Sequence, residues 1–206
     1  MNHNAEKRIG IMGGTFNPIH YGHLIIAENA CEQYHLDRVI FMPTGYAPHK
    51  KFTGEQMTQH RCEMIRLAIE GNEKFSLSRY ETEKHSTNYT YQTLHHMHKI
   101  YPDSDLYFIL GADSLFDFDK WRRPELICQE AVILAAVRDY LTEAKVDTQI
   151  QHLKDTLKGE IYRLDTPNFN VSSKTIRSRL GLGQTIRYMV PDNVETYIKM
   201  QHLYQM

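Results

Sequence analysis

Short apolar runs that favour strands alternate along this chain with segments whose apolar side chains recur at helical spacing. This alternation is typical of βαβ units, in which parallel strands form one sheet and helices cover both of its faces. We expect strands at Arg8–Met12, Arg38–Met42, Phe75–Tyr80, Leu106–Leu110, Ala131–Val137 and Glu160–Leu164. Such sheets bind ligands beyond the carboxyl ends of their strands, so the loops that follow the strands are where a functional site is expected.

The segments between these strands carry apolar stripes that lie on one face of a helix. The stripes are formed by Leu24, Ala27, Cys31 and Tyr34, by Met57, Arg61, Met64 and Ala68, by Val146, Ile150, Leu153 and Leu157, and by Val194, Tyr197, Ile198 and Gln201. Arg61 is the polar exception in the first three stripes, and the last stripe, started by Pro191-Asp192 as a cap, predicts a docked C-terminal helix. The predicted fold class is therefore α/β, a single Rossmann-like domain with a doubly wound, mostly parallel sheet and helices on both faces.

No repeat, low-complexity tract or linker divides the chain, which predicts one domain over residues 1–206, with 1–7 as a disordered leader. A domain of 206 residues buries roughly 70% of its unfolded surface, and an apolar content of 41% suffices to fill that interior. The cysteines Cys31, Cys62 and Cys128 are odd in number and too widely spaced for a zinc cluster, so we expect reduced core residues.

The charge balance excludes several classes of partner. Lys and Arg total 24 against 25 Asp and Glu, which leaves no general attraction for nucleic acid or anionic lipid. The longest apolar run, Ala131–Val137, is far shorter than the ~20 residues that cross a bilayer. The first residues contain no apolar signal segment, which predicts a cytoplasmic protein. We therefore expect no nucleic-acid or membrane partner, and any phosphate binding must be local.

A glycine-rich loop follows the first expected strand. Gly13 and Gly14 allow the backbone to approach a ligand closely, and the helix expected next offers unpaired N–H groups and a partial positive charge to an anion. His20 and His23 stand three apart at the start of that helix, where both imidazoles share a face and can donate hydrogen bonds to phosphate oxygens. The loop therefore indicates phosphate binding, although it matches neither the dinucleotide fingerprint nor the P-loop.

Simpler interpretations of this loop remain. The glycines could serve only a strand-to-helix turn, with the histidines as capping or surface residues. A zinc site would need a third ligand, which the neighbouring sequence lacks.

The full string Gly13–His23 resembles the signature loop of the H-x-G-H nucleotidyltransferases. The segments that resemble one branch of them, the bacterial nicotinate-nucleotide adenylyltransferases, are Phe41–Pro43, Ala47–Lys50, Asn88–Thr93, Ile109–Asp113, Trp121 and Val171–Arg177. The resemblance spans nearly the whole chain. Two positions depart from the family pattern: Asn17 replaces an Asp, which removes a negative charge beside the phosphates, and Lys174 replaces a Thr.

This resemblance implies an adenylyl transfer from ATP to nicotinate mononucleotide, giving nicotinate adenine dinucleotide and pyrophosphate in NAD biosynthesis. It also implies Mg²⁺, bound mainly through the ATP phosphates, because the sequence has no compact carboxylate cluster and no metal-binding residue is assigned. The attacking phosphate is already anionic at pH 7, so the protein has to position the substrates and neutralise charge rather than supply a general base. We also consider a homodimer, for which the sequence itself offers no argument.

The residues that the resemblance assigns fall into three groups. The catalytic group is His20, His23, Lys50 and Arg177. The ATP and phosphate group is Gly13, Gly14, Thr15, Phe16, Gly111, Asp113, Ser172 and Ser173. The nicotinate mononucleotide group is Thr90, Tyr91 and Trp121, with Trp121 stacking on the pyridine ring.

Structural alternatives stand beside several of these roles. Ser172 or Ser173 could simply cap a helix over Lys174–Leu180 that Gly181 ends, Asp113 could cap another, and Trp121 could anchor a loop. Arg138 could approach adenine or phosphate, or form a surface salt bridge. The histidines at 95, 96 and 98 face different sides of one helix and are expected to be solvated.

Three other functions compete with the leading hypothesis. A sibling transferase would act on nicotinamide mononucleotide or phosphopantetheine, and Thr90 and Trp121 argue against it. An inactive nucleotide sensor has the Asn17 change as its support. A nucleic-acid module is disfavoured by the neutral charge.

Overall fold

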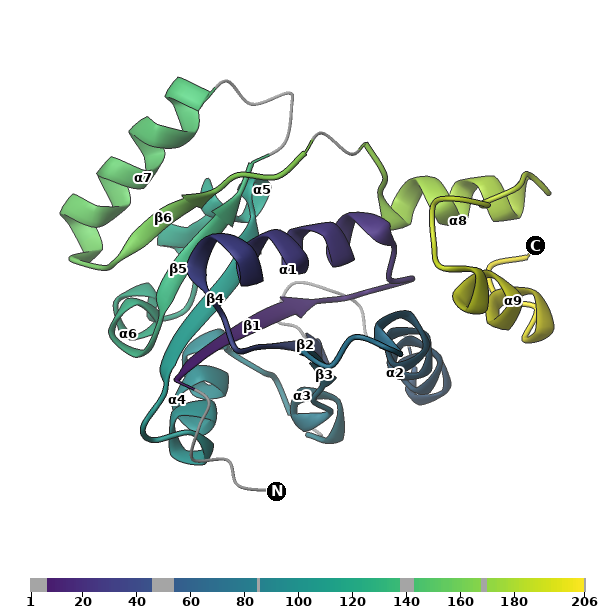
Figure 1. Ribbon diagram of the computed structural model, residues 1–206, viewed down its shortest axis with the longest axis horizontal. Coiled ribbons are helices and arrows are strands. Elements are labelled where there is room, and N and C mark those ends of the chain that lie inside the picture. Colours follow the sequence, from purple (N-terminus) through teal and green to yellow (C-terminus); the bar gives the residue numbers. More distant parts are fainter. Residues whose placement is uncertain (1–6, 46–53, 85, 138–142, 168–169, 206) are drawn as a thin grey trace.

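The computed structural model describes residues 7–45, 54–84, 86–137, 143–167 and 170–205. Its strands form one six-stranded parallel sheet in the order β3-β2-β1-β4-β5-β6 (Figure 1). The strands are β1 (Arg8–Gly14), β2 (Arg38–Pro43), β3 (Phe75–Leu77), β4 (Asp105–Gly111), β5 (Val132–Ala136) and β6 (Ile161–Leu164). This is the strand order of a Rossmann-type doubly wound sheet, so the predicted fold class is confirmed.

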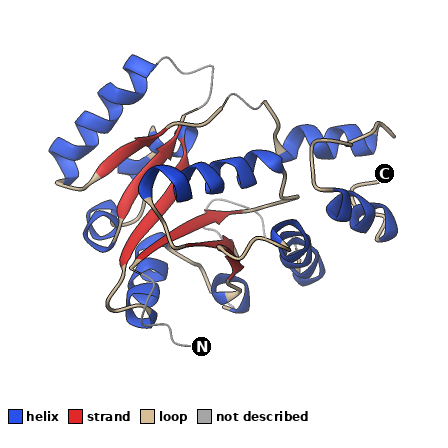
Figure 2. Ribbon diagram, in the orientation of Figure 1, coloured by secondary structure: helices blue, strands red, loops and turns tan. Residues whose placement is uncertain are grey.

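Helices cover both faces of the sheet (Figure 2). They are α1 (Tyr21–Tyr34), α2 (Glu55–Ile69), α3 (Tyr80–Glu83), α4 (Thr90–Ile100), α5 (Ala112–Leu115), the 3-10 turn η2 (Phe118–Lys120), α6 (Pro124–Glu130), α7 (Glu143–Leu157), α8 (Ser173–Gly181) and α9 (Asp192–Met200). The apolar residues of α1, α2, α8 and α9 pack into one core cluster, and those of α4, α5, α6 and α7 pack into a second. The sheet lies between the two.

Because side chains alternate along each strand, the one sheet contributes side chains to both core clusters. Ile9 and Ile11 of β1 belong to the second cluster, whereas Met12 belongs to the first. Likewise Val39 and Phe41 of β2 face the first cluster, whereas Ile40 and Met42 face the other. Because successive side chains of a strand point to opposite faces, a central strand covered on both sides must be apolar throughout.

Several element ends differ from the predicted ones by one to three residues, and two of these differences have a structural reason. The third strand ends at Leu77 rather than at residue 80, since this edge strand pairs only with β2 and Tyr80 already begins α3. Gly181 does not end its helix but is the last helical residue of α8. The turn falls at Gly183, whose φ of +67° is the left-handed conformation that glycine adopts without steric cost.

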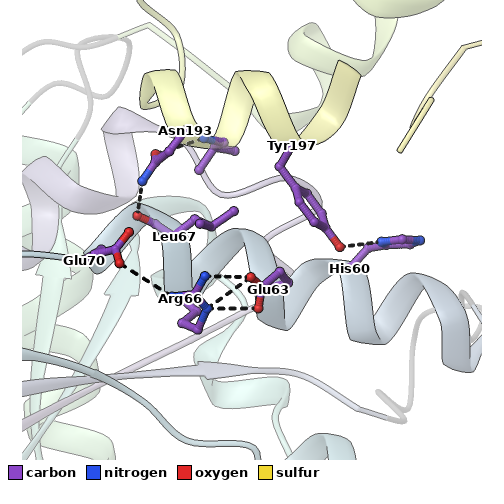
Figure 3. Close-up of polar contacts among 8 residues, drawn as sticks. His60, Glu63, Arg66, Leu67, Glu70, Asn193 and Tyr197 are labelled. Atoms are coloured by element: carbon purple, nitrogen blue, oxygen red, sulfur yellow. Dashed lines mark hydrogen bonds and ion pairs between the residues drawn. The ribbon is translucent and has the colours of Figure 1, made fainter. Parts of the chain in front are cut away.

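The C-terminal helix α9 docks on α2, as predicted (Figure 3). Asn193 Nδ2 donates to the Leu67 carbonyl at 2.6 Å, and the Tyr197 hydroxyl pairs with His60 Nδ1 at 2.8 Å. The predicted cap Pro191-Asp192 stands at the helix start, with Pro191 at the N-cap and Asp192 as the first helical residue, but the N-cap makes no side-chain hydrogen bond. The side chain that accepts a helix-start amide is instead Asn193, from Val194 N.

Of the histidines on α4, His95 and His98 are exposed as expected, whereas His96 is half-buried. His96 stacks on Tyr80 with the ring centroids 3.7 Å apart, and burial lowers its pKa. His95 and His98 both reach Glu130 of α6, at 2.9 and 3.2 Å, so these side chains link α4 to α6.

All three cysteines are free thiols, and burial raises the pKa of Cys31 and of Cys128 to about 11. Cys31 and Cys62 are buried as expected, whereas Cys128 is half-buried. Within the part of the chain that the structure describes, no helix is long and apolar enough to traverse a lipid bilayer.

Candidate active site

The carboxyl ends of β1 and β4 lie side by side at the point where the strand order reverses. Gly13 and Gly14 end β1, and Gly111 ends β4. From β1 the chain winds outward to β2 and β3, then returns to place β4 on the other side. Open α/β sheets bind their ligands in the crevice at this switch point, so the glycine-rich loop is where a ligand is expected.

His20 and His23 stack on one another at the start of α1. Their ring centroids are 3.8 Å apart, with 30° between the ring planes. His20 is the N-cap residue and is 2% exposed, while His23 stands at the third helical position. The His20 amide donates to His23 Nδ1 at 3.3 Å, so the proton of the neutral His23 ring lies on Nε2, which can donate to an anion. The spacing of three thus places both rings together at a helix N-terminus.

Gly14 makes room for the ring of Phe16. A Cβ atom at Gly14 would lie 3.0 Å from that ring, closer than real Cβ contacts normally come. Phe16 is 2% exposed, adopts a φ of +47°, and packs edge-on against His23 with the centroids 4.9 Å apart. The glycine therefore permits an aromatic support for the histidine pair.

Side chains from both α2 and α8 bind carbonyls of this loop. Arg177 Nη1 donates to the Asn17 carbonyl at 2.7 Å, and Ser173 Oγ donates to that of Pro18 at 2.8 Å. From the other side, Arg61 Nη1 donates to the Thr15 carbonyl at 2.8 Å. Arg177 and Ser173, both expected near phosphate, thus lie against the loop, and each uses one donor to hold its backbone.

Ser172 caps α8, because its Oγ accepts the amide of Thr175 at 3.1 Å. The capping interpretation of this serine is therefore correct. The same hydroxyl lies at the N-terminus of α8, a place where anions bind.

Asn17 is bound by the C-terminal end of the chain. The Tyr204 hydroxyl donates to Asn17 Oδ1 at 2.5 Å. Burial raises the pKa of Tyr204, against the opposing effect of Arg177 and Arg61, so the phenol is protonated and acts as the donor at neutral pH. The residue that departs from the family pattern thus has a defined structural partner.

A cavity of about 260 Å³ opens on the α4 side of the same loop. Its lining includes Gly13, Gly14 and Thr15 of the loop, together with Thr44, Asn88, Thr90, Thr93, Trp121 and Arg122. Thr90 and Trp121, assigned to the mononucleotide from the sequence, thus face one cavity together with the glycines. Tyr91 is not among the lining residues, because its side chain packs beside Tyr89 and against the second core cluster.

Trp121 both anchors its loop and lines the cavity. Its ring packs against Phe108 and Phe118, with centroid distances of 6.2 and 5.3 Å. The two interpretations of this residue are therefore compatible, since the rest of the indole remains available to the cavity.

A buried carboxyl group also lines the cavity, and sequence reasoning did not identify it. Glu81 of α3 is 8% exposed and accepts the Thr93 hydroxyl at 2.6 Å. Burial raises its pKa, while the hydrogen bond from Thr93 and the charge of Lys84 act in the opposite direction. Asn88 Nδ2 donates to the Glu81 carbonyl at 2.9 Å, so Glu81 also holds the segment that leads into α4.

Gly111 occupies the N-cap of the short helix α5, and Asp113 lies in the first turn rather than at the cap. The capping interpretation of Asp113 is therefore wrong. Its side chain is exposed beside the carboxyl end of β4. Lys50 and Arg138, the other two basic residues considered from the sequence, lie outside the described residues.

Besides Glu81, sequence reasoning missed Arg61 and Tyr204 as supports of the loop. Arg61 was visible as a polar residue on an apolar helical face, which was a usable signal. Tyr204 gave none, because nothing in the C-terminal segment points to a loop near the other end of the chain.

The cytidylyltransferase-like family profile matches residues 11–179. A relative from Lachnoclostridium phytofermentans, named probable nicotinate-nucleotide adenylyltransferase, is 43% identical over 93% of this chain and 96% of its own length. A relative of the same name from Desulfitobacterium hafniense is 39% identical over the full length of both chains.

Solved structures show the same fold at lower identity. Plasmodium falciparum nicotinic acid mononucleotide adenylyltransferase complexed with NaAD superimposes with a TM-score of 0.77 at 22% identity, covering 96% of this chain and 97% of that one. The same enzyme complexed with APC gives a TM-score of 0.75 at 21% identity over the same shares of the two chains.

Proposed function

The chain belongs to the cytidylyltransferase-like family and, within it, to the nicotinate-nucleotide adenylyltransferases, and we propose that it makes nicotinate adenine dinucleotide from ATP and nicotinate mononucleotide. The observation that carries the proposal is the stacked pair His20 and His23 at the N-terminus of α1, beside a cavity that the glycine loop shares with Thr90 and Trp121. A phosphate site thus adjoins a site for a flat ring. That is the pairing which a reaction between two nucleotides requires.

In the proposed reaction a phosphate oxygen of nicotinate mononucleotide attacks the α-phosphorus of ATP. The new bond joins that oxygen to phosphorus, the bond from the α-phosphorus to the β-bridging oxygen breaks, and pyrophosphate leaves. The enzyme supplies position and positive charge, since the nucleophile is already anionic. We assign this role to His20, His23, Lys50 and Arg177, and assign phosphate contacts to the loop at 13–16, to Gly111 and Asp113, and to Ser172 and Ser173.

The described residues contain no cluster of three or more His, Cys, Asp or Glu side chains arranged to hold a metal. Mg²⁺ keeps most of its waters and binds nucleotides mainly through phosphate oxygens. We propose that it enters with ATP and supplies neutralisation of the charge on the leaving pyrophosphate. Removing the metal with EDTA is expected to abolish turnover, and adding Mg²⁺ back should restore it.

We propose that the cavity holds the nicotinate half of the mononucleotide. Thr90 is the first residue of α4, so its hydroxyl and the unpaired N–H groups of the first turn can donate hydrogen bonds to a carboxylate. Neutral donors at a helix N-terminus favour the carboxylate over an uncharged amide. Trp121 offers its ring for stacking on the pyridine. We assign Tyr91 no side-chain contact with the mononucleotide, only a place in the first turn of α4.

The deciding experiment supplies the purified chain with ATP, Mg²⁺ and each of nicotinate mononucleotide, nicotinamide mononucleotide and phosphopantetheine in turn, and measures pyrophosphate release. We expect the highest kcat/KM with nicotinate mononucleotide. Preference for another acceptor would identify a sibling transferase, and binding of ATP without turnover of any acceptor would identify a nucleotide sensor.

Three further properties belong to this proposal. We propose that residues 1–206 act as one nucleotidyltransferase domain, that the enzyme works in the cytoplasm, and that it forms a homodimer. Sedimentation equilibrium would test the assembly, with a monomer at micromolar concentration counting against it.

A further inference from the structure

A buried arginine lies beneath the phosphate loop. Arg61 of α2 is 1% exposed and is the bulkiest of the fully buried side chains. Its Nη1 donates to the Thr15 carbonyl at 2.8 Å, and its Nη2 donates to the Thr44 carbonyl at 2.9 Å and to Thr58 Oγ1 at 3.1 Å. Thr15 follows β1 and Thr44 follows β2, so one guanidinium joins the carboxyl ends of two neighbouring strands.

The positive charge of Arg61 has no carboxylate to balance it within the described residues. Every acceptor in its contacts is a neutral oxygen, and its Nε is buried without a hydrogen-bond partner. Burial lowers its pKa, although a guanidinium is so basic that it stays protonated at neutral pH. A buried ion that lacks a partner of opposite charge destabilises a protein by several kcal/mol. An anion that binds near Arg61 in the liganded protein would balance its charge.

The contacts of Arg61 also set the direction of two peptide groups. In a planar trans peptide the N–H points opposite to the C=O. Since the carbonyls of Thr15 and Thr44 point toward Arg61, the amides of Phe16 and Gly45 point away from it. Thr15 and Thr44 both line the cavity, whereas Arg61 itself does not, so Arg61 can act on a ligand only through the loop and through its charge.

We propose that the counter-ion of Arg61 is a phosphate group of the bound nucleotide, and that Arg61 is a positioning residue that turns loop amides outward and keeps a fixed positive potential under the phosphate site. The inference rests on the proposed function, in which ATP and a mononucleotide each bring a phosphate to this loop. Either phosphate could be the balancing anion, and binding measurements on both substrates distinguish the two.

The test compares Arg61→Gln, which removes the charge but keeps a donor, with Arg61→Lys, which keeps the charge but loses the planar fork. Arg66→Gln is the matched control, because Arg66 lies on the same helix but is exposed and bound to Glu63. For each protein, titration calorimetry gives the Kd of ATP, of nicotinate mononucleotide and of adenosine, which carries no phosphate. Thermal unfolding of the unliganded proteins is measured alongside.

We expect Arg61→Gln to weaken binding of at least one phosphate-bearing substrate roughly tenfold or more, the order of effect of one partly screened charge. Adenosine binding should stay within twofold, Arg61→Lys should recover part of the loss, and the control should match the wild type. Equal weakening of adenosine and ATP, or unchanged phosphate binding, would overturn the proposal. If Arg61→Gln fails to fold, Arg61→Met, which replaces a buried ion by an apolar chain, decides by the same comparison.

These outcomes are separable from the fate of the proposed function. Turnover of nicotinate mononucleotide by the wild-type protein tests the function, whereas the ratio of ATP to adenosine affinity tests Arg61 without any turnover.

Discussion

The Tyr204 hydroxyl donates a hydrogen bond to Asn17 Oδ1, across 187 residues of sequence. The contact joins the turn after α9 to the loop after β1, and α9 is itself held on α2 through Tyr197 and Asn193 (Figure 3). Asn17 also carries the carbonyl that Arg177 binds. The C-terminal segment is therefore part of the support of the glycine-rich loop.

Replacing Tyr204 by Phe should remove this support while leaving the ring packed. We expect a loss of about 1 kcal/mol in the free energy of unfolding, the usual net contribution of one hydrogen bond, and a several-fold increase in the KM of ATP. Urea denaturation and initial rates of pyrophosphate release measure the two effects. Tyr34→Phe is the control, because it loses a comparable hydrogen bond, from its hydroxyl to the Arg163 carbonyl, that is not part of the loop's support, and should destabilise without changing KM. A KM increase shared by both variants would contradict the role given to Tyr204.

Removing either imidazole of the stacked pair should impair catalysis far more than folding. We expect His20→Ala and His23→Ala to lower turnover by about 10²-fold or more, the scale of losing one preorganised donor to the developing charge. The midpoint of thermal unfolding should change little by comparison. His95→Ala, which loses only a contact to Glu130, serves as a control with normal turnover. Loss of stability in proportion to loss of activity would instead favour a structural role for the pair.

Truncating Trp121 should weaken the binding of one substrate much more than that of the other. We expect Trp121→Ala to weaken binding of nicotinate mononucleotide by at least tenfold and binding of ATP by less than twofold, because the ring lines the cavity on the Thr90 side. Trp121→Phe keeps an aromatic face and should retain most of the affinity. Fluorescence is lost with the only tryptophan, so calorimetry is the appropriate measurement. A parallel weakening of both substrates would show that the ring acts only by packing against Phe118.

The buried carboxyl group predicts a specific pH dependence of stability. Because burial raises the pKa of Glu81 above its ordinary 4.5, the folded state binds more protons than the unfolded state above that pH. Stability from this group is fully present below about 4.5 and is lost as the pH rises through the folded-state pKa. The Glu81→Gln variant has no ionisable group at this position and does not lose this stability as the pH rises. The free energy of unfolding of the variant minus that of the wild type should therefore increase from pH 4 upward and then level off. Urea denaturation between pH 4 and 8 measures it, and a difference that falls with pH would contradict the assignment.

The sequence predicts the structural roles of residues whose contacts are with near neighbours in the chain. The alternation of apolar runs predicts all six strands, because a sheet covered on both faces has no polar side to conceal its pattern. The spacing of His20 and His23 brings their rings together because residues three apart share a helical face. Ser172 caps α8 because its hydroxyl reaches an amide only three residues away.

Tertiary structure decided the contacts that cross the molecule. Arg61, Arg177 and Ser173 bind backbone carbonyls of the loop, and a carbonyl looks the same at every position of a sequence. Tyr91 and Thr90 are neighbours in sequence, yet only Thr90 faces the cavity. The orientation of α4 relative to the sheet determines which of the two side chains does so. The sequence by itself thus determined the sheet, its helices and the histidine pair through short-range periodicity, whereas packing between distant elements alone determined how the loop that carries this pair is held.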